Sequence, residues 1–88
     1  MKAREDMVLR QIGESWYIFP IGQALARKQR VLKMNEVGAF LYGLLEEEQT
    51  VESLIENVLK DYDIDEATAK NVVVGFVNNM IALGLVRG

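Results

Sequence analysis

Residues 32–45 read LKMNEVGAFLYGLL, and this stretch decides the fold because its hydrophobic period changes at Asn35. Before Asn35 the residues alternate, with Leu32 and Met34 on one side and Lys33 on the other, which is the period of a strand. Asparagine is a favoured N-cap residue. Beyond it the apolar residues recur at the spacing of an amphipathic helix: Val37, Phe40, Leu41, Leu44 and Leu45. The stretch therefore predicts a strand that leads directly into a helix.

The sequence before this junction predicts further strands. Residues 7–12 alternate with a period of two, Gly13 and Glu14 form a short turn, and residues 15–19 are aromatic and β-branched. We therefore expect a hairpin over residues 7–19, a connection over 20–27 that bends at Gly22, and a third strand over 28–34. Alternation puts Tyr17 and Phe19 on one face, opposite Trp16 and Ile18, and we expect the Tyr17–Phe19 face to pack on the core.

The sequence after the junction predicts two more helices. Thr50 caps a helix whose apolar face includes Leu54 and Val58, and Asp65 or a neighbouring residue caps a third helix that ends before Gly84. The predicted fold class is α+β, winged helix-turn-helix-like, with an N-terminal three-stranded antiparallel sheet followed by a three-helix bundle. Residues 1–88 are expected to form a single domain, with strands at about 7–34 and helices at about 36–84.

The composition of the chain excludes several classes of function. The 88 residues contain no cysteine and no histidine, which excludes disulfides, zinc fingers, cysteine nucleophiles and imidazole triads. No paired carboxylates or glycine-rich phosphate loop stand out. We therefore expect no catalytic residues, metal ligands or cofactor, so the chain is not expected to be an enzyme. It also has no apolar run of membrane-spanning length and no signal peptide, so a cytoplasmic protein without membrane contact is expected.

Charge is distributed unevenly along the chain. Residues 1–34 hold seven basic and three acidic residues, a formal charge of +4. Residues 35–88 hold three basic and ten acidic residues, a formal charge of −7. Such asymmetry either orients a partner or reflects two ordinary solvated faces.

Three segments together resemble the PqqD-like family. They are the junction at 32–45, the helix start TVESLI at 50–55, and the closing segment FVNNMIALGLV at 76–86. The resemblance implies a RiPP recognition element, a small domain that binds the leader part of a ribosomally made precursor peptide. It also implies a partner enzyme that modifies the precursor, in many cases a radical SAM enzyme. In such domains the leader adds as a strand to the third strand and lies against the last helix.

Physical features of the sequence agree with that implication. The third strand is a candidate open edge, and the last helix is apolar nearly all round, which favours a partner on its second side. We expect the peptide to run antiparallel to residues 28–34. The predicted peptide-binding residues are Lys28, Arg30, Val31, Leu32, Lys33, Val74, Asn78 and Ile81. The cations among them either attract an acidic leader or protect the edge from aggregation.

Two other functions are compatible with the fold. In a winged-helix DNA-binding regulator the last helix would be the recognition helix, but Asp65 and Glu66 at its start repel phosphate. In a self-associating module, such as a homodimer, the open edge and the apolar helix would meet a second copy. The run DYDID at 61–65 has some calcium-loop spacing, although an acidic turn with a helix cap explains it more simply.

Overall fold

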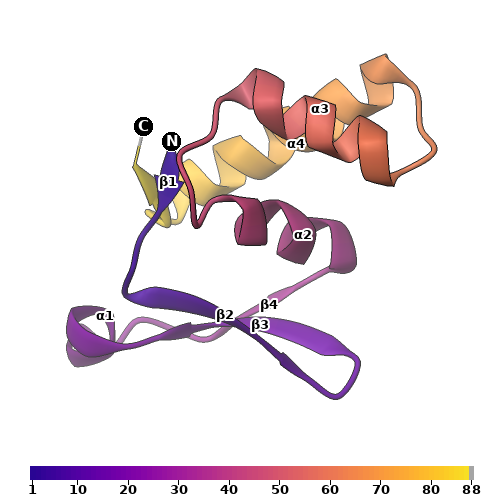
Figure 1. The fold of residues 1–88 in the computed structure, drawn as a ribbon. Helices are drawn as coiled ribbons and strands as arrows, with labels where there is room; N and C mark the ends of the chain where they lie inside the picture. Colours follow the sequence, from indigo (N-terminus) through magenta and orange to yellow (C-terminus); the bar gives the residue numbers. More distant parts are fainter. Residues whose placement is uncertain (88) are drawn as a thin grey trace.

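The computed structural model describes the backbone of residues 1–87 and the side chains of residues 1–86. The elements, in chain order, are β1 (Lys2–Ala3), β2 (Met7–Ile12), β3 (Ser15–Pro20), α1 (Gly22–Ala26), β4 (Leu32–Met34), α2 (Glu36–Leu44), α3 (Val51–Asp61), α4 (Glu66–Ala82) and β5 (Val86–Arg87). Strands β2, β3 and β4 form an antiparallel sheet, and α2, α3 and α4 all lie on one side of it (Figure 1). The predicted α+β fold class is confirmed.

The face of the sheet that meets the helices is the opposite of the predicted one. Ile18 is fully buried in the core, while Tyr17 and Phe19 are half-buried and pack on each other with ring centroids 6.0 Å apart. Strand alternation correctly separates the two sets of residues. It does not say which set the helices cover, because that depends on how the chain leaves the sheet.

The third strand is much shorter than predicted. Residues 22–26, expected in a connection, form the short helix α1, and Ala24 of this helix is fully buried. The backbone N–H groups of Arg27, Lys28 and Gln29 donate to carbonyls of α1, and Lys28 adopts a left-handed conformation with φ of 61°. These groups are therefore unavailable for a ladder, and the strand begins only at Leu32. Lys28, Arg30 and Val31, predicted inside this strand, precede it.

The ends of the long helices agree with the predicted caps. Asn35, Thr50 and Asp65 each accept a hydrogen bond from a backbone N–H in the first turn of α2, α3 and α4. Helix α2 stops at Leu44, before the acidic run 46–48 that opposes its dipole. After α4 the chain turns at Gly84, where φ is 72° and the N–H of Leu85 donates to the Met80 carbonyl at 2.9 Å. This is the Schellman arrangement, and it returns Leu85 to the core.

The two ends of the chain pair with each other, which the sequence did not predict. Ala3 of β1 pairs with Val86 of β5, and the N–H of Ala3 also donates to the Leu45 carbonyl at 2.9 Å. Both ends therefore lie beside the helical layer (Figure 1).

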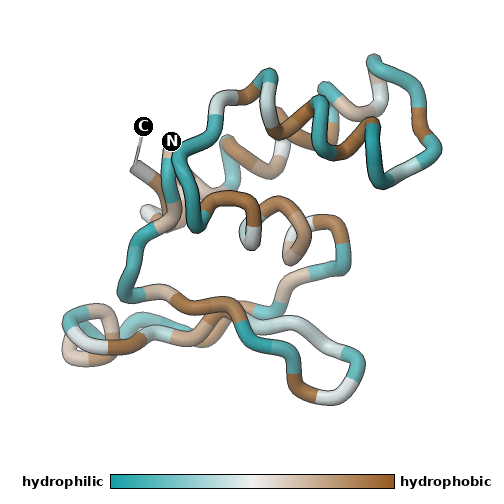
Figure 2. Tube along the Cα trace, in the orientation of Figure 1, coloured by the Kyte–Doolittle hydropathy of each residue, from teal (hydrophilic) through white to brown (hydrophobic). Residues whose placement is uncertain are grey.

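The core lies between the sheet and the helices. Most of its fully buried members come from β3 and the three long helices, and Figure 2 shows hydrophobic stretches in each of these elements. The largest are Ile18, Leu41, Leu45, Leu54, Met80, Leu85, Val58 and Val73. Among the described residues, no helix is long and apolar enough to cross a membrane.

Candidate functional site

A groove of about 600 Å³ lies between the end of β4 and the side of α4. One wall comes from β4 and the first turns of α2, and the other comes from the middle of α4. The lining residues are Lys33, Met34, Asn35, Val37, Gly38 and Leu41 on the first wall, and Asn71, Val72, Gly75, Phe76, Asn79 and Met80 on the second. The groove therefore runs beside an edge strand.

That edge strand is open within the part of the chain that the structure describes. The order of the sheet is β2-β3-β4, so β4 has β3 on one side and no neighbouring strand on the other. In an antiparallel ladder, backbone N–H and C=O groups point alternately to the two sides of a strand. The outer groups of β4 are therefore available to an added strand that enters the groove.

An N-cap hydrogen bond closes the β4–α2 junction. The side-chain oxygen of Asn35 accepts a hydrogen bond from the Gly38 N–H at 2.6 Å. A Cβ atom on residue 38 would lie 2.9 Å from that same oxygen and 3.1 Å from Cε of Met34. Only glycine at this position leaves both neighbours in place. The cap and the glycine together keep this end of the groove open.

The α4 wall presents an amide stripe beside an apolar one. Asn71, Gly75 and Asn79 are spaced four residues apart, so they lie in one row on the helix, and all three are exposed. A Cβ atom at Gly75 would meet nothing within 4 Å. Val72 and Phe76 form the neighbouring row and are half-buried. The wall thus offers amides for hydrogen bonding, open space at Gly75 and an apolar floor.

The structure brings only some of the predicted site residues to this groove. Lys33 lines it, and Leu32 lies in the same strand but packs half-buried against the core. Lys28, Arg30 and Val31 are exposed in the segment that leads into β4. The three predicted residues on α4 are exposed but do not line the groove: Val74, Asn78 and Ile81.

Helix geometry explains this separation on α4. Successive residues turn by about 100°, so Val74 and Ile81 lie across the buried face from residues 72, 76 and 79. Asn78 lies on the solvent-facing side of the helix, opposite the core residues Val73 and Val77. The apolar excess of α4 shows that the helix has two partly apolar flanks. It does not show which flank β4 leaves open, so Asn71, Val72, Gly75, Phe76 and Asn79 were not predicted as site residues.

The start of α4 carries negative charge. The Asp65 carboxylate accepts the Thr68 N–H at 2.7 Å, and this cap, through hydrogen bonds from the side chain and backbone of Thr68, lowers the pKa of Asp65. The role of Asp65 as a helix cap, predicted as the simpler explanation of the acidic turn, is confirmed. Among the described residues, no group of three or more histidine, cysteine or carboxylate side chains is placed to hold a metal ion.

Comparisons with known proteins find one similar structure and one matching family. The structure is similar to that of TbiB1 in complex with the TbiA(beta) leader peptide, with a TM-score of 0.79 and 19% sequence identity. The match covers 100% of this chain and 96% of the TbiB1 chain. No curated protein matches the sequence. The family model described as coenzyme PQQ synthesis protein D (PqqD) matches residues 21–86, which is most of the chain, and the chain therefore belongs to the PqqD family.

Proposed function

We propose that this chain is a noncatalytic adaptor that binds the leader region of a ribosomally synthesised precursor peptide and presents the precursor to a modifying enzyme. The enzyme is a separate protein, and the family resemblance implies that it is a radical SAM enzyme. The adaptor itself carries no cofactor. Because the precursor is made by ribosomes, the proposed compartment is the cytoplasm. Membership of the PqqD family and the likeness to a leader-peptide complex support this function.

The observation that carries the proposal is the position of the groove beside the open edge of β4. In the proposed complex the peptide runs antiparallel to β4, and its backbone pairs with the outer groups of Leu32–Met34. Alternate side chains of an added strand point to opposite faces, so one set enters the groove and contacts Val72 and Phe76. Asn71 and Asn79 are placed to hydrogen-bond the polar groups of the peptide. Lys28, Arg30 and Val31 extend the contact beyond the start of β4.

Two neighbouring asparagines on α4 provide a matched test. A binding peptide is first selected from an mRNA-display library of random 20-residue peptides on the immobilised chain. Its dissociation constant is then measured by fluorescence anisotropy for Asn79→Glu, which changes the groove wall, and for Asn78→Glu, which changes an exposed position that does not line the groove. Because a carboxylate in the groove repels an acidic peptide and loses the amide donor, we expect Asn79→Glu to weaken binding at least about tenfold.

The control variant separates groove binding from a general charge effect. Asn78→Glu has the same change of side chain on the same helix, and we expect its affinity to stay within about twofold of the wild type. Equal weakening by both variants, or weakening by Asn78→Glu alone, contradicts binding in this groove. A library from which no peptide family is enriched contradicts peptide binding itself.

The charge at the start of α4 argues against DNA binding. In a helix-turn-helix regulator the first turn of α4 would approach phosphates, yet Asp63, Asp65 and Glu66 are exposed there. The same anisotropy assay with a labelled DNA duplex is expected to show no saturable binding. The alternative occupant of the groove is a second copy of this chain, paired through β4. A mass that rises with concentration in analytical ultracentrifugation would favour this second copy over the peptide.

A further inference from the structure

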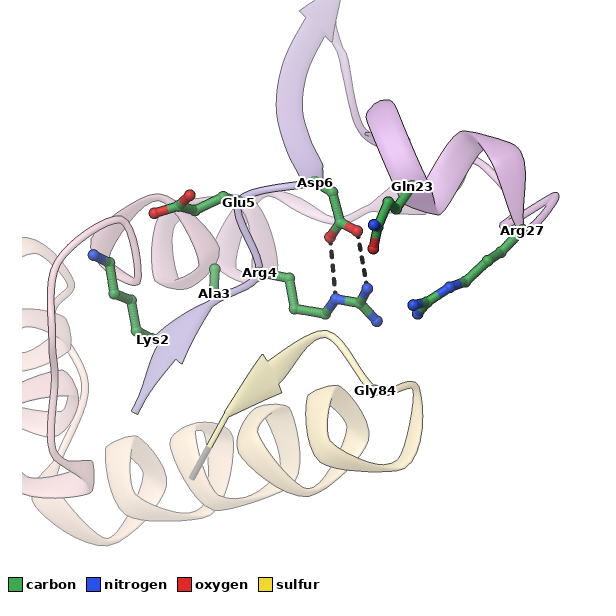
Figure 3. Close-up of a pocket in the computed structure, with 8 residues that line it drawn as sticks. All are labelled: Lys2, Ala3, Arg4, Glu5, Asp6, Gln23, Arg27 and Gly84. Atoms are coloured by element: carbon green, nitrogen blue, oxygen red, sulfur yellow. Dashed lines mark hydrogen bonds and ion pairs between the residues drawn. The ribbon is translucent and has the colours of Figure 1, made fainter.

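A second cavity, of about 630 Å³, lies at another part of the molecule, between the β1–β2 connection, α1 and the turn after α4 (Figure 3). Arg4 enters it from the β1–β2 connection, and Arg27 enters it from the end of α1. Figure 3 shows the two guanidinium groups pointing toward each other. The cavity thus brings together two cations from segments that are far apart in the sequence.

The two arginines differ in how their charge is compensated. Nε and Nη2 of Arg4 donate to the two carboxylate oxygens of Asp6 at 3.0 and 2.9 Å, and both side chains are largely shielded from solvent. Nη1 of Arg4 takes no part in this pair. Among the described residues, the guanidinium of Arg27 has no hydrogen-bond or ion-pair partner and is exposed in the cavity. One positive charge therefore faces the cavity uncompensated.

A carboxylate is the group that this arrangement fits. Because Asp6 already pairs with Arg4, the charge that attracts an anion is the unpaired guanidinium of Arg27. The other carboxylate of the lining, Glu5, points away from both arginines (Figure 3). The planar donor forks of arginine match the two oxygens of a carboxylate. Gln23, one helical turn before Arg27 on α1, adds an amide group to the same wall.

The cavity lies beyond one end of the peptide groove, in the direction in which both of its walls continue. Helix α4 lines the groove as far as Met80, and Gly84, in the turn that follows this helix, lines the cavity. On the other wall, Arg27 is five residues before Leu32, the first residue of β4. Five residues span at most about 16 Å, and this segment is shorter because it turns at Lys28 and is hydrogen-bonded back to α1. A peptide that continues past Leu32 by fewer than five residues therefore reaches the level of Arg27. In a peptide that runs antiparallel to β4, the residues that continue past Leu32 belong to its C-terminal part.

We propose that this cavity binds an aspartate or glutamate side chain of the leader peptide, on the C-terminal side of the stretch that pairs with β4. Arg27 is the main partner of the acidic side chain, and Nη1 of Arg4 completes the site. This inference rests on the proposed function, because it names a second contact of the same peptide. It gives the domain a preference for an acidic residue at a fixed distance from the paired strand.

Selection from a random library tests this preference without knowledge of the natural peptide. The mRNA-display library of 20-residue peptides is selected in parallel on the wild type, on Arg27→Glu and on Arg10→Glu. Arg10 lies on β2, the opposite edge strand of the sheet, so it provides the same change of charge away from the cavity. We expect the wild type and Arg10→Glu to enrich an acidic residue C-terminal to the paired stretch. We expect Arg27→Glu to lose this preference or to select lysine or arginine there.

A double-mutant cycle on one selected peptide then measures the contact. Replacement of its acidic residue by the matching amide is expected to weaken binding to the wild type about three- to tenfold, and binding to Arg27→Ala by less than twofold. An equal loss in both proteins, or enriched peptides with no acidic position, overturns this inference and leaves the proposed function standing. Failure of all three proteins to enrich any peptide family overturns the proposed function, and this inference with it.

Discussion

Tyr42 links the sheet to the helices through one buried hydrogen bond. Its hydroxyl donates to the backbone carbonyl of Met7 at 2.7 Å, and the side chain is 3% exposed. Burial, and to a lesser degree the negative charge of Asp6, raises the pKa of Tyr42 from 10.0 to about 12, while Arg4 acts in the opposite direction. The neutral phenol is therefore the form that the folded state prefers.

Removal of this hydroxyl is expected to destabilise the protein. In Tyr42→Phe the Met7 carbonyl loses its buried donor, which costs about 1–3 kcal/mol of unfolding free energy. Urea unfolding followed by circular dichroism at pH 7 measures this loss. Unchanged stability of Tyr42→Phe would show that water or another group satisfies the carbonyl.

The same substitution changes how stability depends on pH. The folded-state pKa of Tyr42 is raised, so its contribution is fully present below pH 10 and is lost as pH rises from 10 to about 12. We expect the wild type to lose more stability than Tyr42→Phe between pH 9 and 11. Some loss remains in the variant, because burial and the nearby Glu36 and Asp61 also raise the pKa of Tyr62. Identical pH profiles would contradict the buried position of Tyr42.

Among the elements, α4 combines a structural and a binding role on adjacent rows of residues. Ala69, Val73, Val77 and Met80 pack in the core, and the neighbouring row forms the groove wall. Gly75 lies in that wall within a regular helix, where glycine is less favourable than alanine. Its presence therefore lowers helix stability while leaving space in the groove.

Alanine at Gly75 is expected to raise stability and lower affinity at once. A Cβ atom there meets nothing within 4 Å, so Gly75→Ala should stabilise the protein by about 0.5–1 kcal/mol. The methyl group would occupy groove space, and we expect weaker binding of the selected peptide. Gly43→Ala is the matched control, because its Cβ makes an ordinary 3.9 Å contact with Leu9 and lies in α2 outside the groove. Urea unfolding and anisotropy measure the two effects, and equal affinity of both variants would contradict the position of the groove.

The elements also show which features a sequence can predict. Helices α2, α3 and α4 were predicted with nearly correct ends because Asn35, Thr50 and Asp65 act on backbone groups within one turn. The start of β4 was predicted too early because α1 depends on tertiary burial of Ala24, which local alternation does not encode. The groove flank of α4 was not predicted for the same reason, since the position of β4 decides it.

The whole molecule separates charge between its two layers. The segment that leads into β4 carries Arg27, Lys28 and Arg30, whereas the ends of α2 and α3 carry the acidic runs 46–48 and 61–66. A basic region beside the groove attracts an acidic peptide before contact, and an acidic helical layer repels it elsewhere. Charge separation on this scale acts on the rate of association more than on the contacts in the complex.

Salt is therefore expected to slow association of an acidic selected peptide. Between 20 and 300 mM NaCl, stopped-flow measurements should show an association rate constant that falls several-fold, with a nearly constant dissociation rate. An association rate that does not depend on salt would leave these cations with the role of protecting the edge of β4 from aggregation.

In the proposed complex a peptide extends the sheet at β4 and lies against α4. The most direct measurement is a set of intermolecular NOEs between the backbone protons of the selected peptide and those of the isotope-labelled protein. We expect an antiparallel pattern of backbone NOEs to Leu32–Met34, together with side-chain NOEs to Val72 and Phe76. Backbone NOEs to β2, the other edge strand, or side-chain NOEs confined to Val74 and Ile81 would contradict it.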